Sequence, residues 1–142
     1  MPELKCKGVI LCDEIRQEMS GKYLILGAYP SGITVQSMPA NLGLSLYFIV
    51  EFSDIGSQTL HIDVTYLDHN AKMIVELEVA IPNTPMAVPT PRMPFSIADP
   101  CDLVVSVGLD EDKLSEAARF SVGVNPEIWT MYPIEHLQPS EQ

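Results

Sequence analysis

The chain has 142 residues, of which 46% are hydrophobic, and it carries a formal net charge of −11. This length and composition are typical of one globular domain, which buries about two-thirds of its surface without needing a metal ion or a disulfide. The acidic charge argues against nucleic acid and anionic membranes as partners, because both require clustered Lys and Arg. It allows basic proteins and cations.

The sequence indicates a cytoplasmic protein. Residues 1–7 lack the apolar core of a secretion signal, and no segment reaches the ~18 consecutive apolar residues of a membrane helix. Cys6 and Cys12 lie on one predicted strand, about 20 Å apart when it is extended, which is too far for a disulfide. Cys101 begins a later strand, and we expect all three thiols to be reduced and structural.

Helical periodicity is nearly absent, and short alternating runs separated by turn signals predict an all-β fold. The expected strands span residues 5–17, 22–29, 33–35, 42–52, 58–67, 73–81, 95–97 and 101–109. Residues 114–119 are the only candidate for a helical turn, and they could equally begin a strand that ends at Gly123. We expect an antiparallel two-sheet sandwich of seven to nine strands.

An immunoglobulin-like Greek key is the first choice of topology. The similarity to that class is architectural only. Trp129 follows all three cysteines, so the Cys…Trp…Cys pattern of antibody domains is missing. We expect residues 1–126 to form a single sandwich domain, and residues 127–142 to form a proline-punctuated tail that is partly disordered.

Five prolines fall within residues 82–94, so this segment is expected to be an edge strand or an extended connector. Its two Pro-x-x-Pro spacings could also dock into an aromatic groove of a partner module. The segment carries Met86, Val88 and Met93, and Phe95 follows it. Left uncovered, these side chains would form an exposed apolar patch, and we predict that this rim meets another chain.

The first two predicted strands form a hairpin with a charged centre. Glu14, Arg16 and Glu18 project to one face of the first strand, and Lys22 follows the turn, where it could face Glu18. This pattern favours a solvated ladder of ion pairs, each worth at most ~1 kcal/mol. The alternative is that Arg16 binds a carboxylate of a partner in bidentate fashion.

The same hairpin resembles the N-terminal signature of a family of small bacterial and phage-borne all-β proteins of unknown function. The residues that carry the resemblance are Leu11-Cys12-Asp13-Glu14-Ile15-Arg16, Gly21-Lys22 and Gly27-Ala28-Tyr29. Beyond the hairpin the resemblance is only one of strand pattern. It implies a single cytosolic β-sandwich, and it supplies no catalytic residue and no cofactor.

No residues form a recognisable catalytic or transition-metal motif. None of His61, His69 and His136 lies in a motif with Ser or Cys, and Gly-x-Ser-x-Gly is absent. The paired Cys or His spacing of zinc sites is also missing. Acidic residues in or beside turns could hold calcium if their loops converge at one end, although Asp is an ordinary turn residue. These residues are Asp54, Asp68, Asp99, Asp102, Asp110, Glu111 and Asp112.

The sequence favours a non-enzymatic protein that acts through protein–protein contact, as an accessory, adaptor or structural subunit. The expected partner is an unknown protein or further copies of the same chain. The alternative is a small-ligand or calcium-binding sandwich that uses the acidic loops at one end. We assign no catalytic, cofactor-binding or metal-binding residue, and no cofactor.

Overall fold

The structure, a computed structural model, describes residues 2–128. These residues form ten strands and no helix, so the predicted all-β class is confirmed. They include no helix of the length and apolarity needed to cross a membrane. The strands are β1 (Leu4–Gln17), β2 (Tyr23–Tyr29), β3 (Gly32–Val35), β4 (Ala40–Phe52), β5 (Gly56–Tyr66), β6 (His69–Val79), β7 (Met86–Pro89), β8 (Met93–Ile97), β9 (Cys101–Gly108) and β10 (Ser115–Val124).

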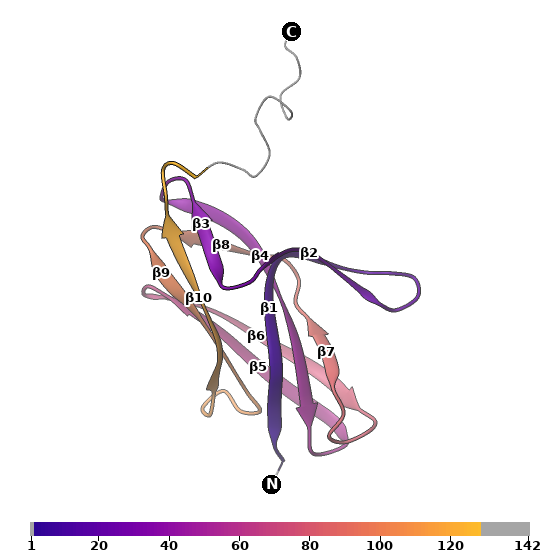
Figure 1. Cartoon of the computed structure of the whole chain (residues 1–142). Helices are drawn as coiled ribbons and strands as arrows, with labels where there is room; N and C mark the ends of the chain where they lie inside the picture. The colour runs from indigo at the N-terminus through magenta and orange to yellow at the C-terminus, as the bar shows by residue number, and fades with distance from the viewer. Residues whose placement is uncertain (1, 129–142) are drawn as a thin grey trace.

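The strands form two five-stranded sheets (Figure 1). The first has the order β2-β1-β4-β7, with β8 also paired to β4, and the second has the order β3-β10-β9-β5-β6. The predicted two-sheet, antiparallel arrangement holds for every described pair except β3 with β10, which is parallel. The strand count exceeds the expected seven to nine, because the proline-rich segment contributes the additional strand β7 and residues 115–124 form β10.

The core lies between the sheets, because alternate side chains of each strand point inward. Phe48, Val50 and Phe52 of β4 are no more than 1% exposed, and they belong to one cluster with Leu60 of β5 and Leu103 of β9. Burying an apolar side chain of this size contributes roughly 1.5–3 kcal/mol. The alternation that predicts the strands therefore also builds the core.

Residues 115–124 form strand β10, so the helical alternative for residues 114–119 is wrong. The register between β10 and β9 shifts at a bulge between Glu116 and Ala118. A bulge adds one residue to one strand and interrupts its alternation, which explains the helix-like local pattern. Beyond the bulge, alternation resumes and buries Phe120 and Val122.

Strand β7 lies at an edge of the first sheet, as predicted for residues 82–94. The predicted exposed patch, in contrast, is wrong. Val88 and Phe95 are only 1% and 2% exposed, and Met86 and Met93 pack against the same core. The reason is that β7 and β8 both pair with β4, so their alternate side chains face inward. These four side chains therefore belong to the core packing, and contact of this rim with another chain stays a prediction.

Residues 125 and 126, which directly precede the predicted tail, are hydrogen-bonded to residues 35 and 36 at the end of β3. The Asn125 N–H donates to the Val35 carbonyl at 2.9 Å, and Gln36 Nε2 donates to the Pro126 carbonyl at 3.4 Å. Most of the tail, with Trp129 and the disorder expected there, is outside the described residues.

Thr90, which lies between β7 and β8 in the chain, continues their pairing with β4. The Leu46 N–H donates to Thr90 Oγ1 at 2.8 Å, and the Thr90 N–H donates to the Leu46 carbonyl at 2.9 Å. Thr90 is only 4% exposed, so water cannot replace its hydroxyl. The Thr90 hydroxyl therefore takes the place of a backbone carbonyl as the acceptor for β4, at the point where the proline-rich segment interrupts the backbone hydrogen bonds.

Thr90→Val should lower the free energy of unfolding by about 1–3 kcal/mol, because it leaves the buried Leu46 N–H without an acceptor. Urea unfolding of the variant and the wild type measures the difference. Thr90→Ser keeps the oxygen and should lose clearly less. Equal losses in the two variants would mean that the threonine methyl group, and not the hydrogen bond, stabilises the segment.

Candidate interaction site

The β1–β2 hairpin leaves the first sheet as a two-stranded arm, defined here as residues 13–28. Strand β1 pairs with β4 as far as Cys12, which faces Ser45, and beyond that point it pairs only with β2. Figure 1 shows the hairpin turning away from the rest of β1 and extending to the side, past β7. The arm therefore presents more of its surface than the strands inside the sandwich do.

The base of the arm is held by Asp13, Gly27 and Tyr29. The Tyr29 hydroxyl donates to Asp13 Oδ1 at 2.6 Å. Gly27 has a left-handed φ of 68°, and a Cβ there would overlap the Asp13 carboxylate. Glycine meets both requirements without strain, so the geometry at the base depends on it.

The charged side chains of the arm pair with one another. Arg16 Nε lies 3.1 Å from Glu14 Oε2, and its second nitrogen Nη2 lies 3.4 Å from Glu14 Oε1. At the tip, Lys22 Nζ lies 3.7 Å from Glu18 Oε1. Of the predicted ladder, the Glu14–Arg16 and Glu18–Lys22 ion pairs are confirmed. The Arg16 guanidinium is already occupied by a carboxylate of its own strand.

The arm has one half-buried face and one exposed face. Tyr23 meets Tyr47 of β4 edge-on, with ring centroids 5.8 Å apart, and Ile25 on the same face of β2 is half-buried. On the opposite face, Leu24 and Leu26 are 44% and 39% exposed. The arm thus rests on the sheet with one side and presents two leucines to solvent with the other.

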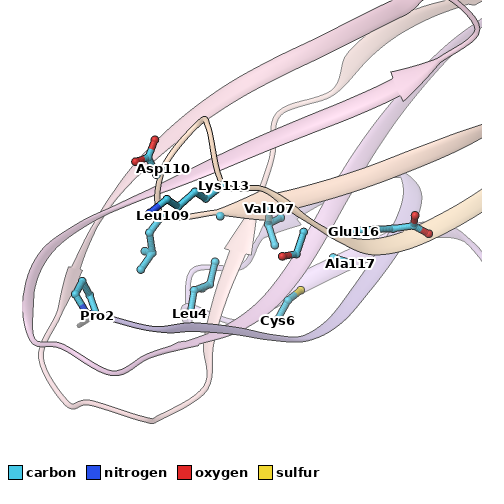
Figure 2. A pocket seen from close by; sticks show the side chains of 11 residues that line it. Pro2, Leu4, Cys6, Val107, Leu109, Asp110, Lys113, Glu116 and Ala117 are labelled. Carbon is cyan, nitrogen blue, oxygen red and sulfur yellow. The ribbon is translucent and has the colours of Figure 1, made fainter.

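A cavity of about 430 Å³ lies between the start of β1 and the β9–β10 hairpin (Figure 2). Its lining residues are Pro2, Leu4, Cys6, Val107, Gly108, Leu109, Asp110, Lys113, Ser115, Glu116 and Ala117. Burial raises the pKa of the Cys6 thiol, which keeps it protonated and weakly nucleophilic at neutral pH. None of the lining residues is a histidine, so no imidazole base accompanies this thiol.

A second cavity, of about 460 Å³, lies over β4 and β8, and its lining residues are Asn41, Leu42, Gly43, Arg92, Met93, Pro94, Phe95 and Ser96. Arg92 is the one charged residue in this lining. Its side chain passes so close to Gly43 that a Cβ there would collide with it. The Arg92 charge also acts to lower the Tyr29 pKa, against the larger effect of burial.

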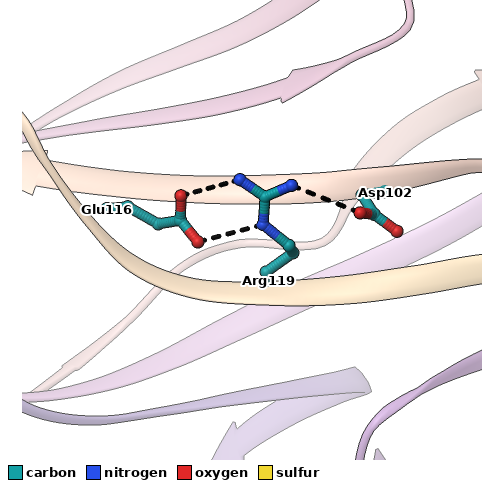
Figure 3. Close-up of polar contacts among 3 residues, drawn as sticks. All are labelled: Asp102, Glu116 and Arg119. Atoms are coloured by element: carbon teal, nitrogen blue, oxygen red, sulfur yellow. Dashed lines mark hydrogen bonds and ion pairs between the residues drawn. The ribbon is translucent and has the colours of Figure 1, made fainter.

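Arg119 of β10 bridges two carboxylates on the outer face of the second sheet (Figure 3). Its guanidinium donates to Glu116 at 3.0 and 2.9 Å and to Asp102 at 3.3 Å. The hydrogen bonds from Arg119 lower the pKa of Glu116, and the two carboxylates raise the pKa of Arg119. Asp102, one of the predicted calcium candidates, is therefore engaged by an arginine.

The acidic turns lie at both ends of the sandwich and not at one. Asp54 and Asp110 follow β4 and β9 at the end where β1 begins, as the pairing of Leu4 with Phe52 and the β5–β9 register require. Asp68 and Asp99 lie at the opposite end. Among residues 2–128, no three His, Cys, Asp or Glu side chains are grouped to hold one metal ion.

The sequence-predicted thiols and histidines are dispersed. Cys6, Cys12 and Cys101 are all free, as predicted, and burial raises the pKa of each. His61 lies on β5, and His69 is the first residue of β6, where its Nε2 lies 3.5 Å from Asp68 Oδ1 and its side chain is largely exposed. His136 is outside the described residues.

Sequence reasoning missed the exposed leucines of the arm. Leu24 and Leu26 alternate with Tyr23 and Ile25, so all four match a strand buried on both faces. The available signal was the register. A hairpin turn at Gly21 places the leucines beside Arg16 and Glu14, which must remain solvated.

A comparison with known proteins finds no family model that matches this sequence and no curated protein that matches it significantly. The resemblance of the hairpin to a family of small bacterial and phage-borne proteins stays a prediction.

Tyr29 should report on the base of the arm at alkaline pH. Burial, followed by the hydrogen bond to Asp13, raises the pKa of Tyr29 from 10.0 to about 12. The folded state therefore holds this proton more tightly than the unfolded state. The resulting stabilisation is complete below pH 10 and is lost as the pH rises towards 12. Tyr29→Phe should flatten the loss of stability over this range, measured by urea unfolding at each pH, and an unchanged slope would contradict the assignment.

Proposed function

We propose that this protein is a non-enzymatic, cytoplasmic binding module that acts through protein–protein contact, with the exposed face of the arm as its contact surface. The observation that carries the proposal is the pair Leu24 and Leu26, which stay exposed on a ribbon whose other face packs on the sheet. Met19 at the tip of the same arm is fully exposed and adds a third apolar side chain. Apolar side chains gathered on a projecting element are typical of interaction sites.

The register defines the chemistry that such a partner must have. Leu24 lies beside Arg16 and Leu26 beside Glu14, so the two leucines are flanked by an ion pair that is already neutralised. The arm therefore has an apolar centre with a polar rim, which is the usual composition of a protein–protein interface. The partner needs no charge of its own to bind it.

The distribution of titratable groups supports a non-enzymatic role. A catalytic site usually gathers several groups with shifted pKa values in one pocket. In the cavity beside β1, the pKa of Cys6 is raised and the pKa of Glu116 is lowered. Both shifts hold these groups in their ordinary protonation states at neutral pH, which suits structure better than proton transfer.

We also propose that the sandwich is immunoglobulin-like. Strands β10, β9, β5 and β6 follow the order G, F, C, C′ of such domains, and β1, β4 and β7 follow the order A, B, E. The chain changes sheet at the β2–β3, β3–β4, β4–β5, β6–β7 and β8–β9 connections, and such crossovers between sheets are typical of Greek-key sandwiches. Strand β2, in the arm, has no counterpart in that scheme.

Replacing both leucines tests the proposed function. The double variant Leu24→Ser/Leu26→Ser should fold normally but lose the partner that co-purifies with the wild type from the cells that make it. We expect a loss of at least about tenfold in binding, because two partly exposed apolar side chains of this size bury enough area to supply ~1.5 kcal/mol or more. Thermal melting confirms the fold, and a pull-down with quantified partner measures the loss.

A control uses apolar residues of greater exposure outside the arm. Ile55 and Ile81 are 64% and 65% exposed. Ile55→Ser/Ile81→Ser should leave partner capture unchanged. If the control abolishes capture and the arm variant does not, the contact surface lies elsewhere.

A further inference from the structure

Strand β6 is the longest regular edge in the two described sheets. Five strands pair on one side only and stand at sheet edges: β2, β7, β8, β3 and β6. Proteins usually protect such edges by shortness, proline or local irregularity. Strands β3 and β7 have four residues each, β7 ends in Pro89, and β2 is distorted at Gly27. Strand β6 has eleven residues, no proline, and one unbroken register with β5.

The centre of β6 carries three outward side chains without partners among the described residues. Lys72, Ile74 and Glu76 are exposed, Ile74 by 61%, and none makes a hydrogen bond or ion pair within residues 2–128. The flanking Asn70 and Glu78, in contrast, each bond to a side chain of β5. The unpartnered groups are thus confined to the middle of the edge.

The inward row of β6 is also incompletely covered. Ala71, Met73, Val75 and Leu77 pack against the core, yet each remains half-buried. In neighbouring β5, by contrast, the central inward residues Leu60, Ile62 and Val64 are fully buried. A further strand along this edge would cover the row and continue the core.

We infer that β6 pairs with β6 of a second copy of this chain, antiparallel and centred on Ile74, to form a homodimer. In this register Ile74 faces Ile74 of the second copy. Lys72 faces Glu76 of the second copy, and the twofold symmetry repeats that ion pair. On the inner face, Met73 meets Val75 and Ala71 meets Leu77.

The charge pattern selects this register among those that keep like faces together. Centring the pair on Glu76 or Lys72 places two identical charges opposite each other. Centring it on Val75 places Ile74 against Glu76, and centring it on Met73 places Ile74 against Lys72. Only the Ile74-centred register joins each lysine to a glutamate and the two isoleucines to each other.

Two effects oppose the pairing, the repulsion between two acidic chains and the competition of Asp63 for Lys72, and a local contact offsets each of them. Each copy carries a net charge of −11, so two copies repel at long range, and the attraction must come from the paired lysines at the edge. Asp63 of β5 faces Lys72 across the strand, but its carboxylate accepts from Asn70 at 3.2 and 3.3 Å. Lys72 therefore remains available to a second copy.

Charge reversal tests both the interface and its register. Sedimentation equilibrium of the full chain should detect the wild-type dimer. Lys72→Glu and Glu76→Lys should each weaken it by roughly tenfold or more, because each converts two attractive cross-strand pairs into two repulsive ones. The double variant Lys72→Glu/Glu76→Lys restores both pairs with the charges exchanged and should recover the wild-type dimer.

Lys7→Glu is the matched control, since Lys7 is an exposed lysine of β1 in the other sheet. It changes the net charge as Lys72→Glu does and should leave dimerisation nearly unaffected. Equal weakening by Lys7→Glu would mean that overall repulsion, and not this edge, controls association. A wild-type chain that stays monomeric up to about 1 mM, the weak end of specific association, would overturn the proposal.

Disulfide trapping reads the register directly. Facing Cα atoms in an antiparallel pair lie about 4.5–5.5 Å apart, within the range of a disulfide. Ile74→Cys should therefore form a covalent dimer on mild oxidation, whereas wild type and Ile81→Cys should not. Failure of Ile74→Cys to cross-link in a solution that sedimentation shows to be dimeric would exclude this register. The arm variants of the previous subsection leave β6 intact, so the two proposals fail independently.

Discussion

Strand β4 is the element on which the rest of the structure depends. All thirteen of its residues fall within its pairings, with β8 through residues 40–44 and with β1 through residues 45–52. Its inward row, which includes Leu46 and Phe48, is almost completely buried. Pairing between β1 and β4 stops at Ser45, so the rest of β1 has only β2 as a backbone partner. The arm therefore exists because the pairing of β1 with β4 ends at Ser45 while β1 continues.

A two-stranded ribbon is only marginally stable in water, so the arm needs local support. It receives that support at both ends. Tyr29 and Asp13 close the base, Tyr23 rests on Tyr47, and Gly21 allows the tight turn at the tip. These contacts leave the opposite face open while they order the backbone. A partner that binds an ordered face avoids most of the entropic cost of fixing it.

The sequence predicts the strands well, because alternation is a local property that burial enforces. It fails where pairing is non-local. From the sequence alone, the apolar residues after Pro85 predict an exposed patch. Pairing of β7 and β8 with β4 instead turns Val88 and Phe95 towards the core. The bulge near Ala117 gives a helix-like local pattern for the same reason. Only the pairing with β9 shows that β10 has one residue more than its partner at this point. Likewise, no local pattern indicates that β1 leaves β4 at Ser45, so the sequence predicts the arm as a hairpin but not as a projection.

The two proposed surfaces are geometrically compatible. In the Ile74-centred register, outward residues of one β6 face outward residues of the other, so the two copies extend a single continuous sheet. Their first sheets must then cover the same side of it. The arms belong to the first sheets, so both would emerge from that side. A partner with two suitable sites would meet both arms at once, and linked binding events of this kind raise the overall affinity without any new type of contact. Self-association through β6 would therefore strengthen binding through the arm.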